Sequence, residues 1–305
     1  MQYLITGGAG FIGGHLVRAL LAAGARVRVF DNLSSGSRAA FGPAAADVEL
    51  HVGDLRDAAA LRTAATGVDA IVHLAALVSV AESVEQPATT YETNVLGTLN
   101  LLDAARAAGV ARVVQASTCA VYGASEKLPA SERDMPVPLS PYAAAKLAAE
   151  QAGQLYHRLY GRDVVALRFF NVYGPRQDPA SPYAAVVPRF AAALRAGQQP
   201  TIYGDGGQTR DFVFVGDIVA GLQCAATAPD IGGAVFNVGR GEEHSVRDLA
   251  YAVGAALGVA VDPIYAPARA GEVRRSRADV QQFAARAGFR ATTDLATGLA
   301  ATLAT

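Results

Sequence analysis

The sequence predicts an α/β fold, in which a doubly wound parallel sheet carries helices on both faces and a smaller α/β lobe follows it. Strand-like apolar runs alternate with segments of helical periodicity through the first 170 residues, which is typical of βαβ units. A glycine-rich turn lies between the first apolar run and the first helical segment. The alternation ends at residues 173–183, where three prolines and a glycine predict a loop, so the lobe is expected to begin there.

The first strand is predicted at residues 3–6 (YLIT), directly before the glycines. A helix is predicted after them, because apolar residues recur at helical spacing until Gly24. The longest helix is predicted over residues 140–161, where Ser140 is a favourable N-cap and Pro141 a favourable first helical residue. The remaining regular elements of the first half are a helix over 93–109 and strands at 26–30, 69–76, 112–117 and 163–174.

Two domains are predicted from this pattern. The first spans residues 1–170, and the smaller lobe spans residues 171–305. The segment of about 210–238 contains a further strand and helix pattern and is expected to return to the first domain. The boundary is therefore not expected to be a single cut.

Composition and charge exclude several classes of protein. A net charge of −1 over 305 residues gives no basic field for nucleic acid or an anionic membrane. Cys119 and Cys224 form no CxxC pair, so neither a zinc site nor a disulfide framework is expected, and no metal is predicted. The sequence has no uncharged apolar run of 18 residues and no signal-peptide pattern, so a cytoplasmic location is expected.

The glycine-rich turn predicts a binding site for a dinucleotide. Gly7, Gly10 and Gly13 follow a predicted strand and open a predicted helix. Glycine is needed there for the sharp turn, for close approach of the backbone to a pyrophosphate, and for tight packing of the helix on the strand. The N-terminus of the helix then offers unpaired N–H groups and a positive dipole end to the anion.

Two aspartates after the second and third predicted strands extend this site. Asp31 lies 18 residues after Gly13. A carboxylate there accepts both ribose hydroxyls of an adenosine and repels a 2′-phosphate, so the expected cofactor is NAD rather than NADP. Asp54 is placed to reach the adenine. An ordinary loop aspartate is the alternative at either position.

Tyr142 and Lys146 stand four residues apart on the longest predicted helix and therefore share one face. A phenol with a pKa near ~10 is a poor base at neutral pH. A nearby ammonium group is expected to lower that pKa. Such a tyrosine can take the proton of a sugar hydroxyl while a hydride leaves the same carbon. Chance pairs at this spacing are common on helices, and the dinucleotide turn upstream is what favours a catalytic role.

Nine sequence blocks resemble the extended short-chain dehydrogenases/reductases, in order and over nearly the whole chain. They are TGGAGFIG, GDLRD, HLAA, TNVLGT, STCAVYG, SPYAAAK, RFFNVYGPRQ, YGDGGQTRDFVFVGD and RAGEVRRSRAD. Within that family, the chain resembles the nucleotide-sugar epimerase/dehydratase group, and the UDP-glucose 4-epimerases most. The resemblance implies a Rossmann-type sheet, NAD, a UDP-sugar substrate held by the C-terminal lobe, and a homodimer packed through residues of about 93–108 and 141–160.

The resemblance also assigns roles to residues. Tyr142 matches the catalytic base, Lys146 the residue that holds the nicotinamide ribose, and Thr118 the hydroxyl that bridges the sugar and the tyrosine. Besides Tyr142 and Lys146, cofactor binding is assigned to Gly7, Gly10, Phe11, Ile12, Gly13, Asp31, Asn32, Asp54, Leu55, Leu74, Ala75, Ala76 and Asn94. Substrate binding is assigned to Ser79, Thr118, Asn171, Val187, Tyr203, Arg210, Arg269, Glu272 and Ser276.

Two of these assignments carry a further expectation, and one histidine beside them is given no part in catalysis. Arg210 and Arg269 match positions around the diphosphate, which suits a guanidinium because it pairs phosphate oxygens bidentately. Ordinary surface arginines are the alternative. His73, in the HLAA block, is expected to be structural rather than an acid–base group.

Members of this group share the oxidation of the sugar C4 hydroxyl by NAD and differ in the step that follows. A 4,6-dehydratase usually carries an Asp–Glu pair just after the Ser/Thr, whereas this chain has Cys119 and Ala120. A related 5,6-dehydratase type has Cys followed by Glu, and a UDP-glucuronate decarboxylase usually has Glu at the second position. The simplest expectation is 4-epimerisation, in which the 4-keto sugar turns over and takes the hydride back on its opposite face. A UDP-glucuronate 4-epimerase, a dehydratase and a non-catalytic NAD-binding regulator stay open.

The substrate stays open between UDP-glucose with UDP-galactose and their N-acetylated forms. Ser276 matches a position where a large aromatic residue crowds the C2 substituent and a small residue leaves room for an N-acetyl group. Val78 and Ala185 depart from the Lys and the Asn that some members carry near the phosphates and the sugar. A uronate stays open because Arg189 is a candidate partner for its carboxylate.

Overall fold

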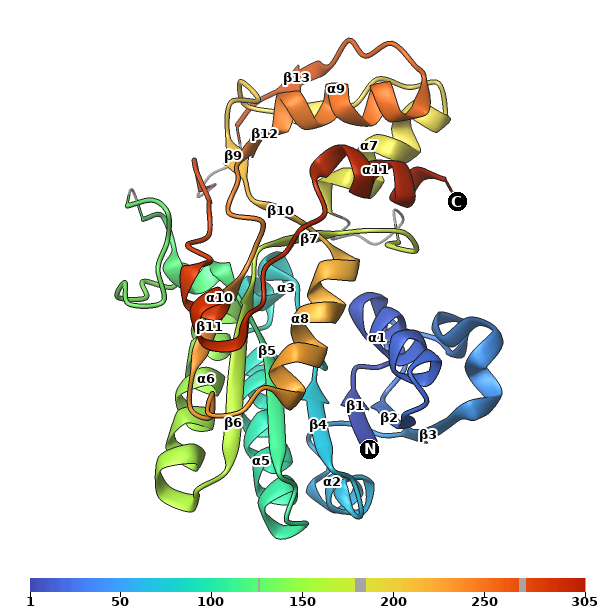
Figure 1. Ribbon diagram of the computed structural model, residues 1–305. Coiled ribbons are helices and arrows are strands. Elements are labelled where there is room, and N and C mark those ends of the chain that lie inside the picture. The colour runs from blue at the N-terminus through green and yellow to red at the C-terminus, as the bar shows by residue number, and fades with distance from the viewer. Residues whose placement is uncertain (126, 179–184, 269–272, 305) are drawn as a thin grey trace.

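The computed structural model describes residues 1–305 apart from 126, 179–184, 269–272 and 305. A seven-stranded sheet with the order β11-β6-β5-β4-β1-β2-β3 runs through its centre, and all neighbouring strands are parallel (Figure 1). The strands are β1 (Gln2–Thr6), β2 (Arg26–Asp31), β3 (Val48–Val52), β4 (Ala70–His73), β5 (Arg112–Thr118), β6 (Asp163–Phe169) and β11 (Val235–Val238). The predicted fold class, a doubly wound parallel α/β sheet, is confirmed.

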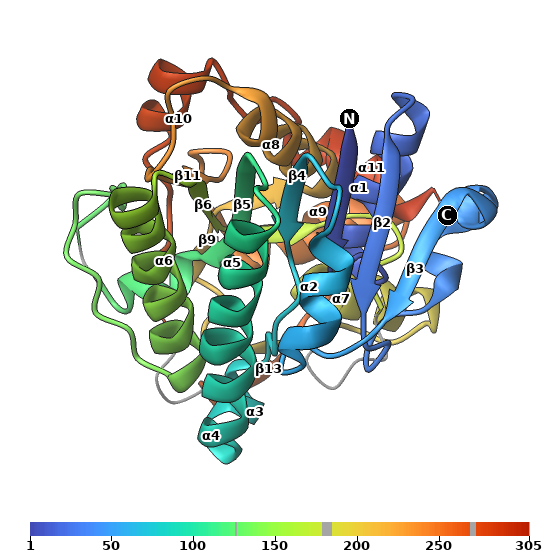
Figure 2. The same cartoon turned by 90° about the horizontal axis from the view of Figure 1, so that it is seen from below.

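Helices cover both faces of this sheet. α1 (Phe11–Ala22) and α8 (Val215–Thr227) lie on one face, and α2 (Ala58–Ala65), α5 (Gly97–Ala107) and α6 (Pro141–Tyr160) lie on the other (Figures 1 and 2). Consecutive residues of a strand serve opposite faces. In β1, Leu4 packs with side chains of α2 and α5, whereas Ile5 packs with side chains of α1 and α8. Both faces are thus apolar, which explains the continuous apolar runs in the sequence.

The predicted caps position α6. The Ser140 hydroxyl accepts a hydrogen bond from the Ala143 N–H at 3.2 Å, and Pro141 occupies the first turn. The helix ends at Gly161, whose φ of 62° is left-handed. Because Ser140 and Pro141 determine where α6 begins, Tyr142 lies in its first turn, at the carboxyl edge of the sheet.

Two predicted elements differ from the structure. The helix expected over 93–109 begins as a π-helical turn, Glu92–Leu96, which follows α3 (Val80–Glu85) and α4 (Pro87–Tyr91) and precedes α5. The strand expected over 163–174 is two strands, because β7 (Asn171–Tyr173) leaves the sheet and pairs with β10 (Phe212–Phe214). The change of partner occurs between Phe170, whose N–H bonds Val238, and Asn171, whose N–H bonds Asp211.

The C-terminal lobe has a hydrophobic core of its own, which includes Phe190, Ile202, Leu249, Val253 and Leu299. Its elements are α7 (Val186–Arg195), β8 (Thr201–Tyr203), β9 (Thr209–Arg210), β12 (His244–Ser245), α9 (Val246–Leu257), β13 (Ile264–Ala266) and α11 (Leu295–Leu303). α8 and β11 instead belong to the large sheet, and α10 (Gln281–Ala287) packs on β11. The exact division into two domains stays a prediction.

Two short 3-10 segments complete the fold. Residues Arg38–Asp47 (η1) pack beside α1, and residues Cys119–Tyr122 (η3) follow β5. Across the described ranges, no helix combines the length and the apolar character that crossing a bilayer requires.

Candidate active site

The carboxyl ends of β1 and β4 meet at the point where the strand order reverses. The chain runs from β1 outward to β2 and β3 on one side, and from β4 to β5 and β6 on the other. In open parallel sheets, ligands bind in the crevice at this switch point. The residues predicted to bind the cofactor follow β1, β2, β3 and β4 at this edge, and Thr118 ends β5.

The glycine turn after β1 is shaped by close backbone contacts. Gly7 has a φ of 69°, and a Cβ on it would lie 2.5 Å from the Ala75 nitrogen. A Cβ on Gly13 would lie 2.2 Å from the Gly7 oxygen. Around Gly10 the space is wider, since a Cβ there would meet only the Gly7 oxygen, at 3.4 Å. Gly7 and Gly13 therefore close the turn, and Gly10 borders the open side.

The N-terminus of α1 offers its N–H groups to a ligand. No side chain caps the helix at Gly10, whereas Asp57 caps α2 and Ser140 caps α6. Phe11 and Ile12 open the helix at this end. An uncapped first turn leaves N–H donors and a positive dipole end directed at one point. This cradle suits a pyrophosphate.

Asp31 at the end of β2 is buried and bonded to the backbone. Its carboxylate accepts the Ala9 N–H at 2.9 Å and the Leu33 N–H at 2.8 Å. An ionised carboxylate has further lone pairs, so it can accept ribose hydroxyls as well. These contacts hold the Asp31 carboxylate beside the glycine turn, although Asp31 follows Ala9 by 22 residues in the sequence. The donor set of this crevice therefore fits NAD.

Asn32 and Asp54 lie side by side at the next position along the edge, with the Asn32 amide 3.2 Å from the Asp54 carboxylate. Asp54 is also paired with Arg56 at 2.8 Å, and this guanidinium holds the pKa of Asp54 well below its usual range. Leu55, which follows Asp54, is buried against α2 and α5. The structure thus gives Asp54 a protein partner in addition to its predicted place near an adenine.

Asn94 supports the segment after β4 from behind. It is buried in the π-helical turn, where its amide donates to the Leu77 carbonyl at 2.9 Å and accepts the Leu77 N–H at 2.8 Å. Leu77 directly follows Leu74, Ala75 and Ala76, which were predicted to line the cofactor. Asn94 therefore acts on the site by holding this segment.

Tyr142, Thr118 and Lys146 come together at the ends of β5 and α6. The Tyr142 hydroxyl lies close enough to the Thr118 hydroxyl for Thr118 to lower the pKa of the phenol. Lys146 lies one helical turn after Tyr142, and its side chain is buried. Burial is the largest influence on both groups, since it raises the pKa of Tyr142 to about 12 and lowers the pKa of Lys146 to about 8.

The expected lowering of the pKa of Tyr142 by Lys146 is not among the influences on this phenol. The Thr118 hydroxyl lowers the pKa of Tyr142, but burial outweighs it and the neighbouring Cys119 raises the pKa further. Lys146 acts instead on His73, whose pKa is lowered to about 3 by burial and by this ammonium. The His73 ring bonds Thr6 at 2.7 Å and Thr98 at 3.0 Å, so it is a neutral structural side chain.

A cavity of about 470 Å³ opens in the C-terminal lobe beside β7. It is lined by four residues predicted to bind the substrate: Asn171, Val187, Tyr203 and Arg210. Val78, Ala185 and Arg189, the three positions singled out in the sequence, line it as well. The cavity therefore holds two arginines, Arg189 and Arg210, as an anionic ligand requires.

Cys119 lies between this cavity and Tyr142. Ser276, Arg210 and Tyr142 are its electrostatic neighbours, since Ser276 and Arg210 lower the pKa of the thiol and the thiol raises the pKa of Tyr142. Asp211 anchors the same corner, because its fully buried carboxylate accepts N–H groups of Arg240, Gly241 and Ala278 at 2.7 to 3.0 Å. The Ser276 segment is thus tied to the strand that carries Arg210.

One predicted substrate residue of the described chain, Ser79, lies apart from this arrangement. The Ser79 hydroxyl caps α3 by accepting the Glu82 N–H at 3.0 Å, and Ser79 does not line the cavity. Arg269 and Glu272 lie outside the described residues. Their proposed roles therefore depend on the sequence resemblance alone.

The sequence reasoning missed Gln208, which lines the cavity. Its amide nitrogen donates to the Tyr203 carbonyl at 2.8 Å, while its buried oxygen has no partner within the described part of the chain. A buried acceptor of this kind normally finds a donor. The block YGDGGQTRDF was the available signal, but only its tyrosine and arginine were assigned.

Comparisons with known proteins agree with this geometry. The model of the NAD dependent epimerase/dehydratase family matches residues 3–239. Over 308 residues, the chain is 44% identical to a UDP-glucose 4-epimerase of Mycolicibacterium smegmatis, with 99% of this chain and 97% of that protein covered.

Two solved structures are also similar over nearly their whole length. A UDP-N-acetylglucosamine 4-epimerase from Methanobrevibacter ruminantium is 37% identical, with a TM-score of 0.95 and coverage of 99% of this chain and 97% of that one. A UDP-glucose 4-epimerase of Thermus thermophilus, solved in complex with NAD, is 40% identical, with a TM-score of 0.91 and coverage of 100% and 98%. The protein described here belongs to the NAD dependent epimerase/dehydratase family.

Proposed function

We propose that the protein catalyses the NAD-dependent 4-epimerisation of a UDP-hexose, interconverting UDP-glucose and UDP-galactose. The observation that carries this proposal is the placement of the Tyr142 hydroxyl beside Thr118, with buried Lys146 one helical turn away, at the crevice that fits NAD. The arginine-lined cavity lies on the other side of Cys119. Cofactor crevice, acid–base pair and anion site are the three parts that the reaction needs.

The glycine turn, Asp31 and Lys146 would hold NAD, which when bound would supply the acceptor for the C4 hydride and, through its oxidised ring, a positive charge in the crevice. Tyr142 takes the proton of the C4 hydroxyl, which leaves a ketone at C4, and later gives the proton back. Thr118 donates to the phenolate oxygen and so stabilises the base in its ionised form. Lys146, as an ammonium, orients the ribose hydroxyls and adds a second positive charge near Tyr142.

Burial disfavours the phenolate of Tyr142, because it raises the pKa of this side chain to about 12. Positive charge near the phenol favours the phenolate. Lys146 and an oxidised nicotinamide ring would therefore both help Tyr142 to act as the base.

The two residues after Thr118 favour epimerisation over loss of water. Burial raises the pKa of the Cys119 thiol to about 11, so this group stays protonated and serves poorly as a base. Ala120 has no proton to exchange. The pair of acid and base groups that a 4,6-elimination needs is therefore missing from this position, and the ketone has only the returning hydride to react with.

The N-acetylated pair is a second candidate substrate. Ser276 is small and half-buried and lies beside Cys119, between cavity and base, so it leaves room beside the sugar. A relative with the same fold and 37% identity is named a UDP-N-acetylglucosamine 4-epimerase. We propose that the protein accepts both series.

A homodimer in the cytoplasm is part of the proposal. Large apolar side chains are exposed along the two predicted contact segments, namely Leu96, Leu155, Leu159 and Tyr160. Exposed apolar patches of this kind are typical of protein–protein contacts. Both cysteines carry free thiols, which suits a reducing compartment.

A substrate panel tests the function. The purified protein is incubated with UDP-glucose, UDP-galactose, their N-acetylated forms and UDP-glucuronate, and the products are resolved by NMR. We expect the C4 epimer of at least one neutral hexose and no change in mass. A product that has lost water or CO₂ would contradict the proposed epimerisation and indicate a dehydratase or a decarboxylase. Binding of NAD without turnover of any of the five sugars would favour a regulator.

A further inference from the structure

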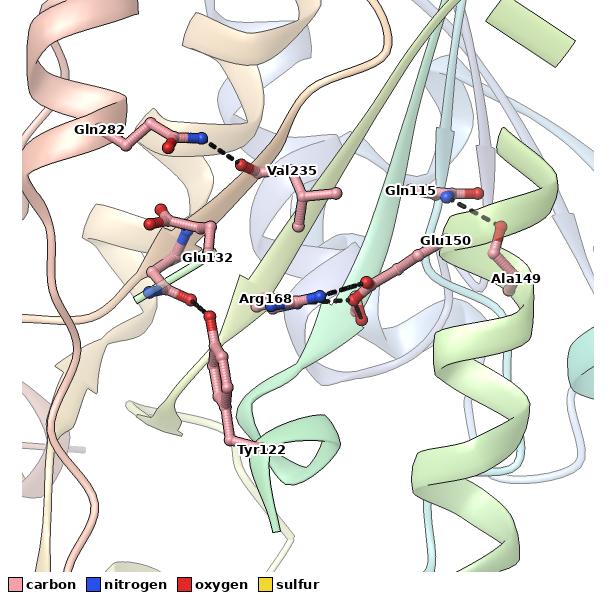
Figure 3. A network of polar contacts seen from close by, with 10 residues as sticks. Gln115, Tyr122, Glu132, Ala149, Glu150, Arg168, Val235 and Gln282 are labelled. Carbon is pink, nitrogen blue, oxygen red and sulfur yellow. Dashed lines mark hydrogen bonds and ion pairs between the residues drawn. The ribbon is translucent and has the colours of Figure 1, made fainter. Parts of the chain in front are cut away.

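Beneath the Tyr142–Lys146 pair lies an ion pair that the proposed reaction does not use. Glu150 and Arg168 are 2% and 3% exposed. Arg168 contacts the carboxylate at 2.7 Å through Nη2 and at 3.0 Å through Nε, and the Ser117 hydroxyl donates to the same carboxylate (Figure 3). Ser117 directly precedes Thr118. The pair therefore borders the catalytic groups from both β5 and α6.

Such a pair is costly to keep. Two charges removed from water lose solvation that their attraction repays only in part, and apolar residues of similar volume are often as stable. Burial by itself gives no reason for charges at these positions. Their placement gives one, because Glu150 follows Lys146 by four residues and both side chains occupy the buried face of α6.

Arg168 is held from its other side by a polar network. Its guanidinium lies 4.8 Å from the centre of the Tyr122 ring. The Tyr122 hydroxyl donates to Asn237 Oδ1 at 2.6 Å, and the Asn237 N–H bonds Glu132 at 2.7 Å (Figure 3). β6, η3 and β11 thus fix the guanidinium, which in turn fixes the Glu150 carboxylate relative to Lys146.

No other anion near Lys146 takes the place of Glu150. His73 on β4 is neutral, β5 contributes the uncharged Ser117 and Thr118, and the Cys119 thiol on η3 is protonated. The acidic side chains on the helices that contact α6 lie at half-buried or exposed positions of the described chain; they are Glu82, Glu85, Glu92 and Asp103. Of the acidic groups described, Glu150 is the one that raises the pKa of Lys146.

We propose that Glu150 and Arg168 form a pair of positioning residues with opposed effects on Lys146. The Glu150 carboxylate keeps the buried ammonium charged, and the Arg168 guanidinium holds that carboxylate in place and moderates its field. The proposal rests on the proposed function, in which Lys146 works as an ammonium. It adds that Glu150 and Arg168, which contact neither the cofactor nor the substrate, set the pH range in which the enzyme is active.

The signs of the expected changes are opposite for the two members. Burial lowers the pKa of Lys146 to about 8, and the charge of Glu150 raises it against that trend. Glu150→Gln removes the negative charge, so the pKa of Lys146 falls further. Arg168→Gln removes the compensating positive charge, so the pKa of Lys146 rises. If the ion pair is purely structural, both variants should lose stability, and the pKa of Lys146 should not move in opposite directions in the two.

The composition of the chain makes this measurable on one residue. Its 26 basic residues include only two lysines, Lys127 and Lys146. Protein labelled with ¹³C at lysine Cε therefore gives two titrating NMR signals. Lys127 is exposed and paired with Asp134, so it serves as an internal reference. Lys146→Arg assigns the signals, and the titration is done on the ligand-free protein, which separates it from turnover.

We expect the Lys146 midpoint to fall by about one pH unit in Glu150→Gln and to rise in Arg168→Gln, with Lys127 unchanged. Gln151→Glu, at an exposed position of the same helix, adds a charge in water and should leave Lys146 in place. In the active protein, the alkaline limb of kcat/KM should follow the same two directions.

Glu150→Gln/Arg168→Gln keeps the test decisive if Arg168→Gln fails to fold. Removing the guanidinium from the Glu150→Gln background should raise the Lys146 midpoint relative to that single variant. Equal midpoints in wild type and Glu150→Gln, or shifts of one sign in both single variants, would overturn the proposal. Failure of the proposed function has a different signature, which is full epimerase activity of Tyr142→Phe whatever the lysine midpoints are.

Discussion

At the scale of single residues, burial of Tyr142 and Lys146 disfavours the ionised forms that the proposed reaction uses. Burial raises the pKa of Tyr142 to about 12 and lowers that of Lys146 to about 8, so both groups are driven toward their neutral forms. Catalysis needs the opposite, a phenolate beside an ammonium. The Thr118 hydroxyl and the Glu150 carboxylate each favour the ionised form of one partner. The protonation state of Tyr142 therefore depends on a balance between burial and local charge, and added positive charge favours the phenolate.

Replacing the tyrosine tests this directly. Tyr142→Phe keeps the ring and removes the acid–base group, so kcat should fall by about 10³-fold, within the range of general acid–base catalysis. Cofactor content should not change, because the ring does not carry the pyrophosphate contacts. Tyr156→Phe, on the same helix and bonded to Asp103 at 2.9 Å, is the matched control and should keep its activity. Equal rates for the two variants would remove Tyr142 from the mechanism.

The glycines of the turn should separate folding from binding. Gly13→Ala places a methyl group 2.2 Å from the Gly7 oxygen, so the free energy of unfolding should fall by about 2 kcal/mol or more. Gly10→Ala meets protein only at 3.4 Å but points to the open side. Its stability should stay near wild type while NAD affinity falls on the order of tenfold. Denaturation and calorimetric titration measure the two effects. Unchanged NAD affinity in Gly10→Ala would place the pyrophosphate elsewhere.

At the scale of elements, the sequence predicted which segments are strands and helices but not all of their partners. The run DVVALRFFNVYG is mostly apolar, so its periodicity contains no sign that the hydrogen-bond partner changes between Phe170 and Asn171. The division into β6 and β7 depends on Val238 and Asp211, which come much later in the chain. The cap of α6 was predictable because the two residues that form it, Ser140 and Ala143, are close together in the sequence.

The same difference applies to the site. The glycines, Asp31 and the Tyr–Lys pair have local spacings with a physical meaning, and the structure gathers them at one edge. The Cys119–Ser276 contact and the Glu150–Arg168 pair join separate elements of the fold, and no local pattern marks them. The Gln208 amide bonds Tyr203 within one sequence block, but that block does not show that Gln208 lines the cavity. The Ser79 hydroxyl caps a helix, and its proposed contact with the substrate stays a prediction.

The π-helical turn offers a test of how one element supports another. Asn94→Ala removes both hydrogen bonds to Leu77 and leaves buried backbone groups unpaired, so the free energy of unfolding should fall by about 2 kcal/mol. NAD binding should weaken as well, because residues 74–77 lose their anchor. Asn100→Ala, which removes one half-buried bond to Leu55, is the milder control. A loss of stability with unaltered NAD affinity would show that this segment does not contact the cofactor.

At the scale of the whole molecule, the sheet supplies the cofactor crevice and the C-terminal lobe supplies the anion cavity. β7 and the segment that carries Arg210 and Asp211 cross between them, so the two parts share one boundary (Figure 1). Cys119 and Ser276 meet at that boundary. We expect the sugar of a nucleotide bound in the cavity to meet Tyr142 at this boundary.

Association of two copies is expected through α6 and the segment before α5. Leu159 is 67% exposed, and an arginine there should convert a dimer to a monomer in analytical ultracentrifugation. Ile264→Arg, at a similarly exposed position on β13, is the control and should leave the assembly unchanged. A monomeric wild type, or a dimer that tolerates Leu159→Arg, would contradict this surface.

The central claim is that one hydride leaves C4 and returns to the same carbon. The most direct measurement follows deuterium in UDP-[4-²H]glucose during turnover in ordinary water. The account predicts UDP-galactose that keeps its deuterium at C4, with no label in solvent and no loss of mass. Washing out of the label, or a product lacking the elements of water, would contradict it.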